Sequence, residues 1–300
     1  MKNPFLRARI NARHILMMIS AKGGVGKSTV TVNLAAALKA RGLTVGIFDA
    51  DLYGPNIPAL LGIRQKRDLT TTRHPEAMIP IAARPDALDM RPMKPYERYG
   101  IGLMSIGLLV GETQAINPQS DTIGAIITSL LARVEWDADV LLVDMPPGTG
   151  EPLNSLLGAG MVDAALLIAV RERLAHLDNG RLVSLLRTQN LPVLGVVENM
   201  THVVCPRCGE LIDLYPAPAA GEAAYHGAEV LASLPFHPDL IRQGQPGPPL
   251  PLKDAESPAR EPLLSLADAV LERLDGAALR RPRNSAEADP TSDEDCPDCP

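Results

Sequence analysis

The sequence predicts an α/β protein whose doubly wound, mainly parallel sheet carries helices on both faces. Short aliphatic runs alternate with helix-like segments along the chain, as in repeated strand–helix–strand units. The segment Thr29–Arg41 separates the first two runs and is followed by Gly42, a residue typical of helix C-termini. Only 3% of the residues are aromatic, so small and aliphatic residues must fill the core, which suits a sheet buried on both faces. The predicted strands are His14–Ser20, Leu43–Phe48, Leu103–Leu108, Val140–Val143, Ala164–Val170, Val193–Glu198 and Val230–Leu234.

Most of the chain is predicted to form one domain. Residues 1–13 are expected to be an N-terminal leader, and residues 14–275 the domain itself. Residues from about 64 to 99 are rich in Pro, Arg and Asp and lack periodicity, which predicts a long surface insertion. Apolar residues at helical spacing predict a helix over Leu263–Leu274. Residues 276–300 are polar and acidic without an apolar pattern, which predicts a disordered tail.

Charge and hydropathy argue against several classes of partner. The formal net charge of −6 argues against nucleic-acid binding, because that function needs clustered Lys and Arg. No run of about 18 apolar residues occurs, so no membrane-spanning helix is expected. The basic N-terminus lacks the apolar core and the small-residue cleavage site of a signal peptide. We therefore expect a cytoplasmic protein that binds neither nucleic acid nor membrane.

A glycine-rich loop follows the first predicted strand. Its glycines allow backbone angles that direct successive N–H groups inward, where they and the N-terminus of the next helix bind phosphate oxygens. Lys27 can reach the β- and γ-phosphates of ATP, and the Ser28 hydroxyl can ligate Mg²⁺. The loop has Ala21 where the strict motif has glycine, and it adds a second lysine, Lys22. The loop residues expected to bind the nucleotide are Lys22, Gly23, Gly24, Val25, Gly26, Lys27, Ser28 and Thr29.

Carboxylates follow two further strands, at the sheet edge where α/β proteins bind ligands. Asp144 ends one buried run, and we predict that it binds Mg²⁺ directly or through water. Asp51 is the candidate for positioning the attacking water and a further candidate Mg²⁺ ligand, with Asp49 alongside. Lys27, Asp51 and Asp49 are thus candidate catalytic residues for hydrolysis of ATP to ADP and phosphate, a reaction catalysed by positioning and charge stabilisation.

Four cysteines form two Cys-x-x-Cys pairs, Cys205/Cys208 and Cys296/Cys299. In a chain without an export signal, such pairs favour metal ligands or redox thiols over disulfides. One pair provides half of a tetrahedral zinc site, and a [4Fe–4S] cluster usually takes four cysteines. A symmetric dimer solves this count, because two copies of Cys205/Cys208 supply four thiolates. Taken alone, the pair is most often used for structural zinc, so the residues themselves leave the metal open.

Several motifs together resemble a known family. The loop with two lysines resembles the deviant Walker A motif of the MinD/ParA/nitrogenase-iron-protein class of P-loop NTPases. From about Leu16 to Glu261, the order of motifs is similar to that of the Mrp/ApbC-type carriers of iron–sulfur clusters. The matching stretches are KGGVGKSTVTVNLA, DADLYGPNIPALLG, MSIGLLV, VDMPPGTG, PVLGVVENM and VCPRCGE.

The resemblance implies roles for individual residues. The family holds a bridging [4Fe–4S] cluster at a homodimer interface with the cysteines that correspond to Cys205 and Cys208. It implies partners as well, namely apo iron–sulfur proteins and a cluster assembly scaffold. Lys22 is implied to act in catalysis by reaching the nucleotide of the partner subunit, and Asn199 is implied to touch the adenine.

The chain departs from the family at several places. Ile116–Ser120 stands where an Arg-Gly-Pro element is usual, Val170-Arg171-Glu172-Arg173 stands where Thr-Pro-Gln is usual, and the insertion at 64–99 has no clear family pattern. The pair Cys296/Cys299 lies outside the common pattern. Our hypothesis is that this pair is a possible second metal site on a mobile arm that exchanges metal or cluster with the central pair. The alternative is an incidental thiol pair in the tail.

Two alternative functions stay open. One is a positioning ATPase like MinD or ParA that acts on membrane or DNA, although this leaves Cys205 and Cys208 unexplained. The other is an ATPase metallochaperone that binds zinc or nickel, since thiolate pairs bind several soft metals.

Overall fold

The computed structural model describes residues 7–63, 92–109, 120–205, 207–216, 224–241, 247–253 and 256–276. These residues form an eight-stranded sheet in the order β10-β7-β6-β1-β5-β2-β4-β3. Neighbouring strands are parallel except β3 and β4, which pair antiparallel at one edge. The strands are β1 (Ala12–Ile19), β2 (Val45–Asp49), β3 (Tyr96–Arg98), β4 (Ile101–Ser105), β5 (Ala138–Asp144), β6 (Ala164–Ala169), β7 (Val193–Glu198) and β10 (Val230–Ser233).

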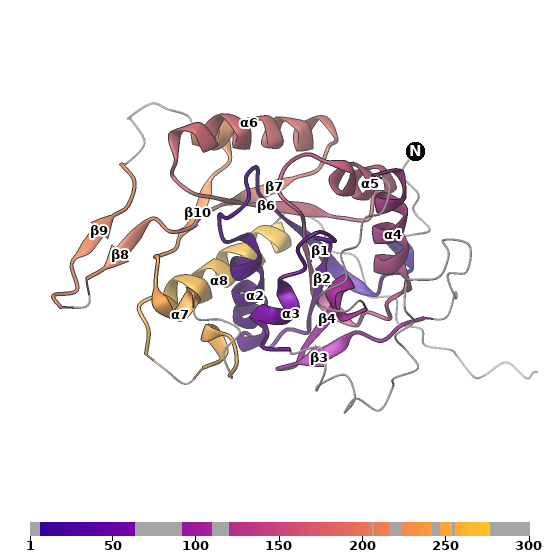
Figure 1. Cartoon of the computed structure of the whole chain (residues 1–300), viewed down its shortest axis with the longest axis horizontal. Helices are drawn as coiled ribbons and strands as arrows, with labels where there is room; N and C mark the ends of the chain where they lie inside the picture. The colour runs from indigo at the N-terminus through magenta and orange to yellow at the C-terminus, as the bar shows by residue number, and fades with distance from the viewer. Residues whose placement is uncertain are drawn as a thin grey trace, which may run out of the picture.

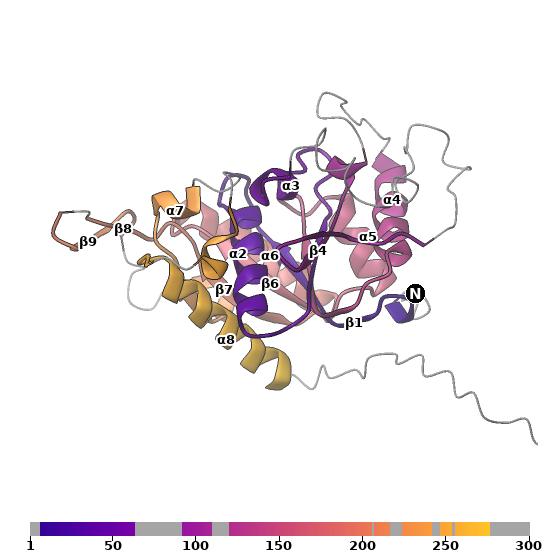
Figure 2. The ribbon, with the colours of Figure 1, turned by 90° about the horizontal axis from the view of Figure 1, so that it is seen from below.

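Helices cover both faces of the sheet. Helices α2 and α8 lie side by side on one face, and α4, α5 and α6 pack on the other (Figures 1 and 2). Short 3-10 turns lie at Ile106–Leu108, Ala224–Gly227 and Leu250–Leu252. The helices are α2 (Lys27–Ala40), α3 (Ile57–Leu60), α4 (Ser120–Arg133), α5 (Glu151–Ala159), α6 (Arg173–Thr188), α7 (Pro238–Ile241) and α8 (Arg260–Gly276).

Strand β1 shows why the sheet strands are continuously apolar. Its side chains Ile15, Met17 and Ile19 belong to the core under α4, α5 and α6. The alternate side chains Leu16 and Met18 belong to the core under α2 and α8. Because successive side chains of a strand point to opposite faces, a strand covered on both sides must be apolar at every position.

A separate two-stranded hairpin lies outside the main sheet. It consists of β8 (His202–Val204) and β9 (Leu211–Asp213), which pair antiparallel. In both ribbon views the hairpin extends away from the sheet, beyond α7 (Figures 1 and 2). Its exposed apolar side chains are Leu211 and Ile212, with Leu214 just after β9.

The predicted fold class is confirmed, and all seven predicted strands are present in the main sheet. Strand β3 lies within the predicted insertion 64–99, where Tyr96–Arg98 pairs with β4. Strand β1 begins at Ala12, inside the predicted leader, and Arg7 forms a buried ion pair with Asp163 at 2.8 Å. Residues 64–91 of the insertion and the tail 277–300 lie outside the described residues. Among the helices that the structure does describe, none has the length and apolar character needed to cross a membrane.

Candidate nucleotide and metal-binding site

The glycine-rich loop joins the central strand β1 to helix α2. Gly24 and Gly26 adopt φ angles of 78° and 82°, in the left-handed region that glycine occupies readily. Helix α2 begins at Lys27, so its unpaired N–H groups face the loop. Strand β1 lies between β5 and β6 in the sheet. The loop follows the carboxyl end of β1, where the connections from neighbouring strands run to opposite faces of the sheet. The residues 22–29 line a cavity of about 590 Å³.

Asp144 contacts three side chains of the loop and of helix α2. It ends β5, where the parallel register places it beside Met18 of β1. Its carboxylate accepts hydrogen bonds from the Ser28 hydroxyl at 2.6 Å and the Thr31 hydroxyl at 2.7 Å. The same carboxylate lies 2.8 Å from Lys27 Nζ, and both side chains are buried. The predicted phosphate-binding lysine and the two predicted Mg²⁺ ligands Ser28 and Asp144 therefore form one network.

Asp49 and Asp51 occupy different environments. Asp49 is buried at the end of β2, in register with Asp144, and accepts a hydrogen bond from Ser105 Oγ at 2.9 Å. Burial, and then the charge of Asp144, raise the pKa of Asp49 well above its ordinary value. Asp51 lines the cavity and accepts hydrogen bonds from the backbone N–H groups of Tyr53 and Gly54. Of the two, Asp51 can therefore contact a bound nucleotide or water in the cavity, whereas Asp49 is buried in the protein beneath Asp51.

Lys22 stands at the mouth of the cavity, where its side chain is 34% exposed. Its ammonium lies 3.5 Å from the carboxylate of Glu172, which is part of the departure from the family pattern. An exposed pair of this kind contributes about 0–1 kcal/mol, so it does not fix the lysine in place. The trans role of Lys22 stays a prediction.

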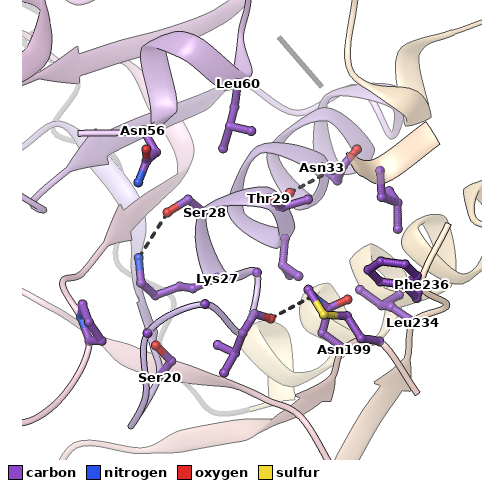
Figure 3. Close-up of a pocket in the computed structure, with 18 of the residues that line it drawn as sticks. Ser20, Lys27, Ser28, Thr29, Asn33, Asn56, Leu60, Asn199, Leu234 and Phe236 are labelled. Carbon is purple, nitrogen blue, oxygen red and sulfur yellow. Dashed lines mark hydrogen bonds between the residues drawn. The ribbon is translucent and has the colours of Figure 1, made fainter. Parts of the chain in front are cut away.

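Asn199 follows β7 and touches the phosphate loop. Its side-chain amide donates a hydrogen bond to the backbone oxygen of Val25 at 2.8 Å (Figure 3). Asn199 lines the cavity on the side away from Lys27, next to Phe236 and Leu234 (Figure 3). The cavity thus has a polar end at Lys27 and Ser28 and an apolar end near Asn199.

The tight approach of Asn199 to Gly26 gives a testable consequence. A Cβ atom at Gly26 would lie 2.3 Å from Asn199 Nδ2, whereas one at Gly24 would meet nothing within 4 Å. Both positions have left-handed backbone, so alanine costs about 1–2 kcal/mol of stability at either one. We expect Gly26→Ala also to displace Asn199 and lower ADP affinity by at least about tenfold, as loss of roughly 1.4 kcal/mol would. Urea unfolding and ADP titration of Gly26→Ala and Gly24→Ala measure this, and equal ADP affinities would contradict it.

The cysteine pair Cys205/Cys208 lies at the turn of the hairpin. The turn is held by hydrogen bonds from Cys205 N to Glu210 O at 2.8 Å and from Gly209 N to Cys205 O at 2.9 Å. Cys205 is partly exposed and Cys208 is exposed. The backbone N–H groups of Arg207 and Cys208, followed by the Cys208 side chain, lower the pKa of the Cys205 thiol. The turn therefore favours the thiolate form, which is the form that binds metals.

Among the described residues, the hairpin offers two candidate metal ligands, Cys205 and Cys208. No group of three or more His, Cys, Asp or Glu side chains placed to hold a metal ion occurs in the described ranges. Cys296 and Cys299 lie outside them.

Two contributions to the site were missed by sequence reasoning. Thr31, one turn into α2, donates a hydrogen bond to Asp144. The apolar wall of the cavity comes largely from the segment after β10. This segment could have been predicted to reach the site, because it follows a strand that ends at the same carboxyl edge as the phosphate loop. This wall consists of Leu234, Pro235, Phe236, Leu240 and Leu263.

Comparison with known proteins agrees with this arrangement. The profile of the ParA family, described as NUBPL iron-transfer P-loop NTPase, matches residues 11–271. The iron–sulfur cluster carrier protein of Pyrococcus abyssi is 33% identical over 268 residues, which cover 87% of each chain. The carrier protein of Pseudomonas fragi is 35% identical over 251 residues, covering 83% of this chain and 82% of its own.

Solved structures show the same fold. The nucleotide-binding protein of Archaeoglobus fulgidus in complex with ADP, in which cobalt was found, aligns with a TM-score of 0.61 and 30% identity over 78% of this chain and 86% of its own. The cell division ATPase MinD of Pyrococcus furiosus aligns with a TM-score of 0.57 over 87% of this chain and 99% of its own, and its 23% identity supports the fold alone. With its phosphate loop, its cysteine pair and these relatives, the chain belongs to the iron-transfer branch of the ParA family of P-loop NTPases, the iron–sulfur cluster carriers.

Proposed function

We propose that the protein hydrolyses ATP and carries a [4Fe–4S] cluster bridged between the Cys205/Cys208 pairs of two copies, for delivery to apo-proteins. The observation that carries this proposal is the position of the two thiols. They lie on an exposed turn whose backbone N–H groups lower the pKa of Cys205, and the hairpin begins two residues after Met200, which lines the nucleotide cavity. A cargo held there is accessible to a recipient protein without passing through the core.

The cavity fits a nucleoside triphosphate in shape and chemistry. Its polar end offers loop N–H groups and Lys27 to the phosphates, and its apolar end offers Leu234 and Phe236 to a flat base. Asn33 also lines the cavity, and its side-chain amide donates a hydrogen bond to the backbone oxygen of Thr29 at 2.8 Å.

The ATPase step is assigned to the residues around Asp144. Ser28 and Asp144 offer hard oxygen ligands, which suit Mg²⁺, and their direct 2.6 Å contact supports a role for both at one ion. Bound Mg²⁺ would neutralise charge on the phosphates. Lys27 holds the β- and γ-phosphates, Asp51 orients the attacking water, and Lys22 stabilises the developing charge from the partner copy. The products are ADP and phosphate.

The dimer is supported by the ligand count and by the hairpin surface. Two thiolates per chain are half of the four that a [4Fe–4S] cluster usually takes. Leu211, Ile212 and Leu214 are 63%, 51% and 44% exposed on the element that carries the thiols. Burial of these side chains against a second copy would bring the two thiol pairs together.

Anaerobic reconstitution with iron and sulfide tests the proposal. Wild type is expected to gain an absorption band near 400 nm with about four iron and four sulfide per two chains. The Cys205→Ala/Cys208→Ala variant is expected to lose the band, and the Cys296→Ala/Cys299→Ala variant, a matched control, to keep it. Light scattering of the loaded sample reports the mass of the dimer.

Other outcomes would contradict the proposal in distinct ways. Loss of the band in the tail variant would assign two of the ligands to Cys296 and Cys299. If the wild type held zinc tightly and showed no absorption band near 400 nm, the result would favour the metallochaperone alternative and contradict the carrier proposal.

A further inference from the structure

The segment Leu234–Phe236 lies between the nucleotide cavity and the cysteine hairpin. All three of its residues line the cavity. Its backbone is also bonded to the base of the hairpin, since Phe236 N donates to His202 O at 2.8 Å. Leu234 O accepts two further hydrogen bonds, from Thr201 N at 3.0 Å and from Thr201 Oγ1 at 3.2 Å. This segment therefore connects the wall of the cavity directly to the first residues of the hairpin.

The chain itself provides a second connection between the same two places. Asn199 and Met200 line the cavity, and the chain continues from them into β8 and on to Cys205. Met200 adopts a left-handed φ of 57°, a conformation that is uncommon for a side chain of this size. Asn199 is bonded to the phosphate loop through Val25 O. The hairpin is thus connected to the cavity in two ways, through the chain at Asn199 and Met200 and through hydrogen bonds to Leu234 and Phe236. A nucleotide in the cavity would contact residues of both connections.

Phe236 is the side chain best placed to sense the ligand. It is 40% exposed, and it stands beside Asn199 and Leu234 at the apolar end of the cavity (Figure 3). Partial exposure of a phenyl ring in a cavity wall leaves a flat surface on which a base can stack. The same residue donates the backbone hydrogen bond to His202, so the position of its ring and the position of β8 are linked within one residue.

We infer that Phe236 couples the nucleotide cavity to the cysteine hairpin: a bound base packs on its ring, and the Phe236–His202 hydrogen bond passes the change to Cys205 and Cys208. This inference rests on the proposed nucleotide site but not on the cluster. It assigns to Phe236 a positioning role for the thiols in addition to binding of the base. Coupling free energies between sites commonly change an equilibrium by about 5- to 150-fold, which sets the size of the expected effect.

The test measures alkylation of the thiols in the full, metal-free chain. Reduced protein reacts with iodoacetamide, and peptide mass spectrometry gives separate rates for Cys205 and Cys208. In wild type, saturating Mg²⁺-ADP or a non-hydrolysable ATP analogue is expected to change these rates by at least about fivefold. The rates at Cys296 and Cys299 in the same sample provide an internal reference for reagent concentration.

Variants at residue 236 identify the coupling residue. Phe236→Ala is expected to bring the ratio of rates with and without nucleotide close to one, and Phe236→Leu to reduce it, whereas Phe236→Tyr keeps it. Each ratio is taken at a nucleotide concentration well above the Kd of that variant, so that weaker binding does not mimic lost coupling. Leu177→Ala is the matched control, because Leu177 is an exposed apolar side chain that does not line the cavity.

The outcomes separate this inference from the proposed function. An unchanged ratio in both Phe236→Ala and Phe236→Leu would overturn the role of Phe236, and no nucleotide effect in wild type would overturn the coupling altogether. If reconstitution yields no cluster but nucleotide still changes the alkylation rates through Phe236, the carrier proposal fails and the coupling stands.

Discussion

Replacement of Lys22 by Ala is expected to lower kcat for ATP hydrolysis by about 10³–10⁵-fold, the range found when a cation delivered to the transition state is removed. Nucleotide binding is expected to persist, because the loop N–H groups and Lys27 remain in place. Within the described part of the chain, the ion pair of the Lys22 side chain is the exposed one with Glu172, so folding is expected to be unaffected. Steady-state phosphate release and ATP titration measure the two effects.

A matched variant and a mixing experiment sharpen this test. Glu172→Gln removes the exposed counter-ion of Lys22, and we expect kcat to change by less than about fivefold. Mixing Lys22→Ala with Asp51→Ala tests action in trans: the Lys22→Ala copy keeps its own Asp51 and receives Lys22 from the other copy. Recovery of hydrolysis in the mixture supports action across the dimer. A kcat within about tenfold of wild type for Lys22→Ala alone would contradict a catalytic role.

Substitution of Lys27 by Met is expected to destabilise the fold by about 3–5 kcal/mol, because it leaves the carboxylate of Asp144 buried without its cation. The Lys27 and Asp144 side chains are 7% and 1% exposed, so water cannot replace the lost partner. Methionine preserves most of the aliphatic stem, which isolates the charge from the packing. Urea unfolding measures the change, and nucleotide binding is expected to be lost in the same variant.

The double variant Lys27→Met/Asp144→Asn provides the control. Removal of the charge at both positions is expected to recover part of the lost stability, because no uncompensated buried charge remains. The Ser28 and Thr31 hydroxyls bond different carboxylate oxygens of Asp144, so with the amide at position 144 one hydroxyl keeps an oxygen acceptor and the other can accept from the NH2 group. A loss below about 1 kcal/mol in Lys27→Met would show that these two hydroxyls alone stabilise the carboxylate.

Much of the fold was predictable from composition and periodicity alone. A parallel sheet covered on both faces requires uninterrupted aliphatic strands, and residues such as Leu16 and Met17 are apolar for that reason. The phosphate loop was predictable because its glycines and lysines have few other uses in that order. The proximity of Ser28 to Asp144 follows from parallel strands ending at one edge.

Other parts depend on contacts between distant segments, and local pattern did not reveal them. Strands β3, β8 and β9 have three residues each, too few for an alternation of apolar and polar residues to be recognised. The burial of Asp49 behind Ser105 depends on the register of β2 with β4, which no local pattern encodes. Phe236 reaches the cavity because β10 joins the sheet at the edge beyond β7, a matter of topology.

Among the described residues, β8 and β9 pair as strands with each other, the bond from Leu214 N to Thr201 O closes the base of the hairpin, and Thr201 and His202 bond the body at Leu234 and Phe236. Segments held by few contacts open locally at a small fraction of the free energy of global unfolding. The thiol-bearing turn can therefore fray and reclose many times during the life of one folded molecule, while the central strand β1 stays protected from hydrogen exchange. Substitutions on the hairpin outside Cys205 and Cys208 are accordingly expected to cost the fold little stability.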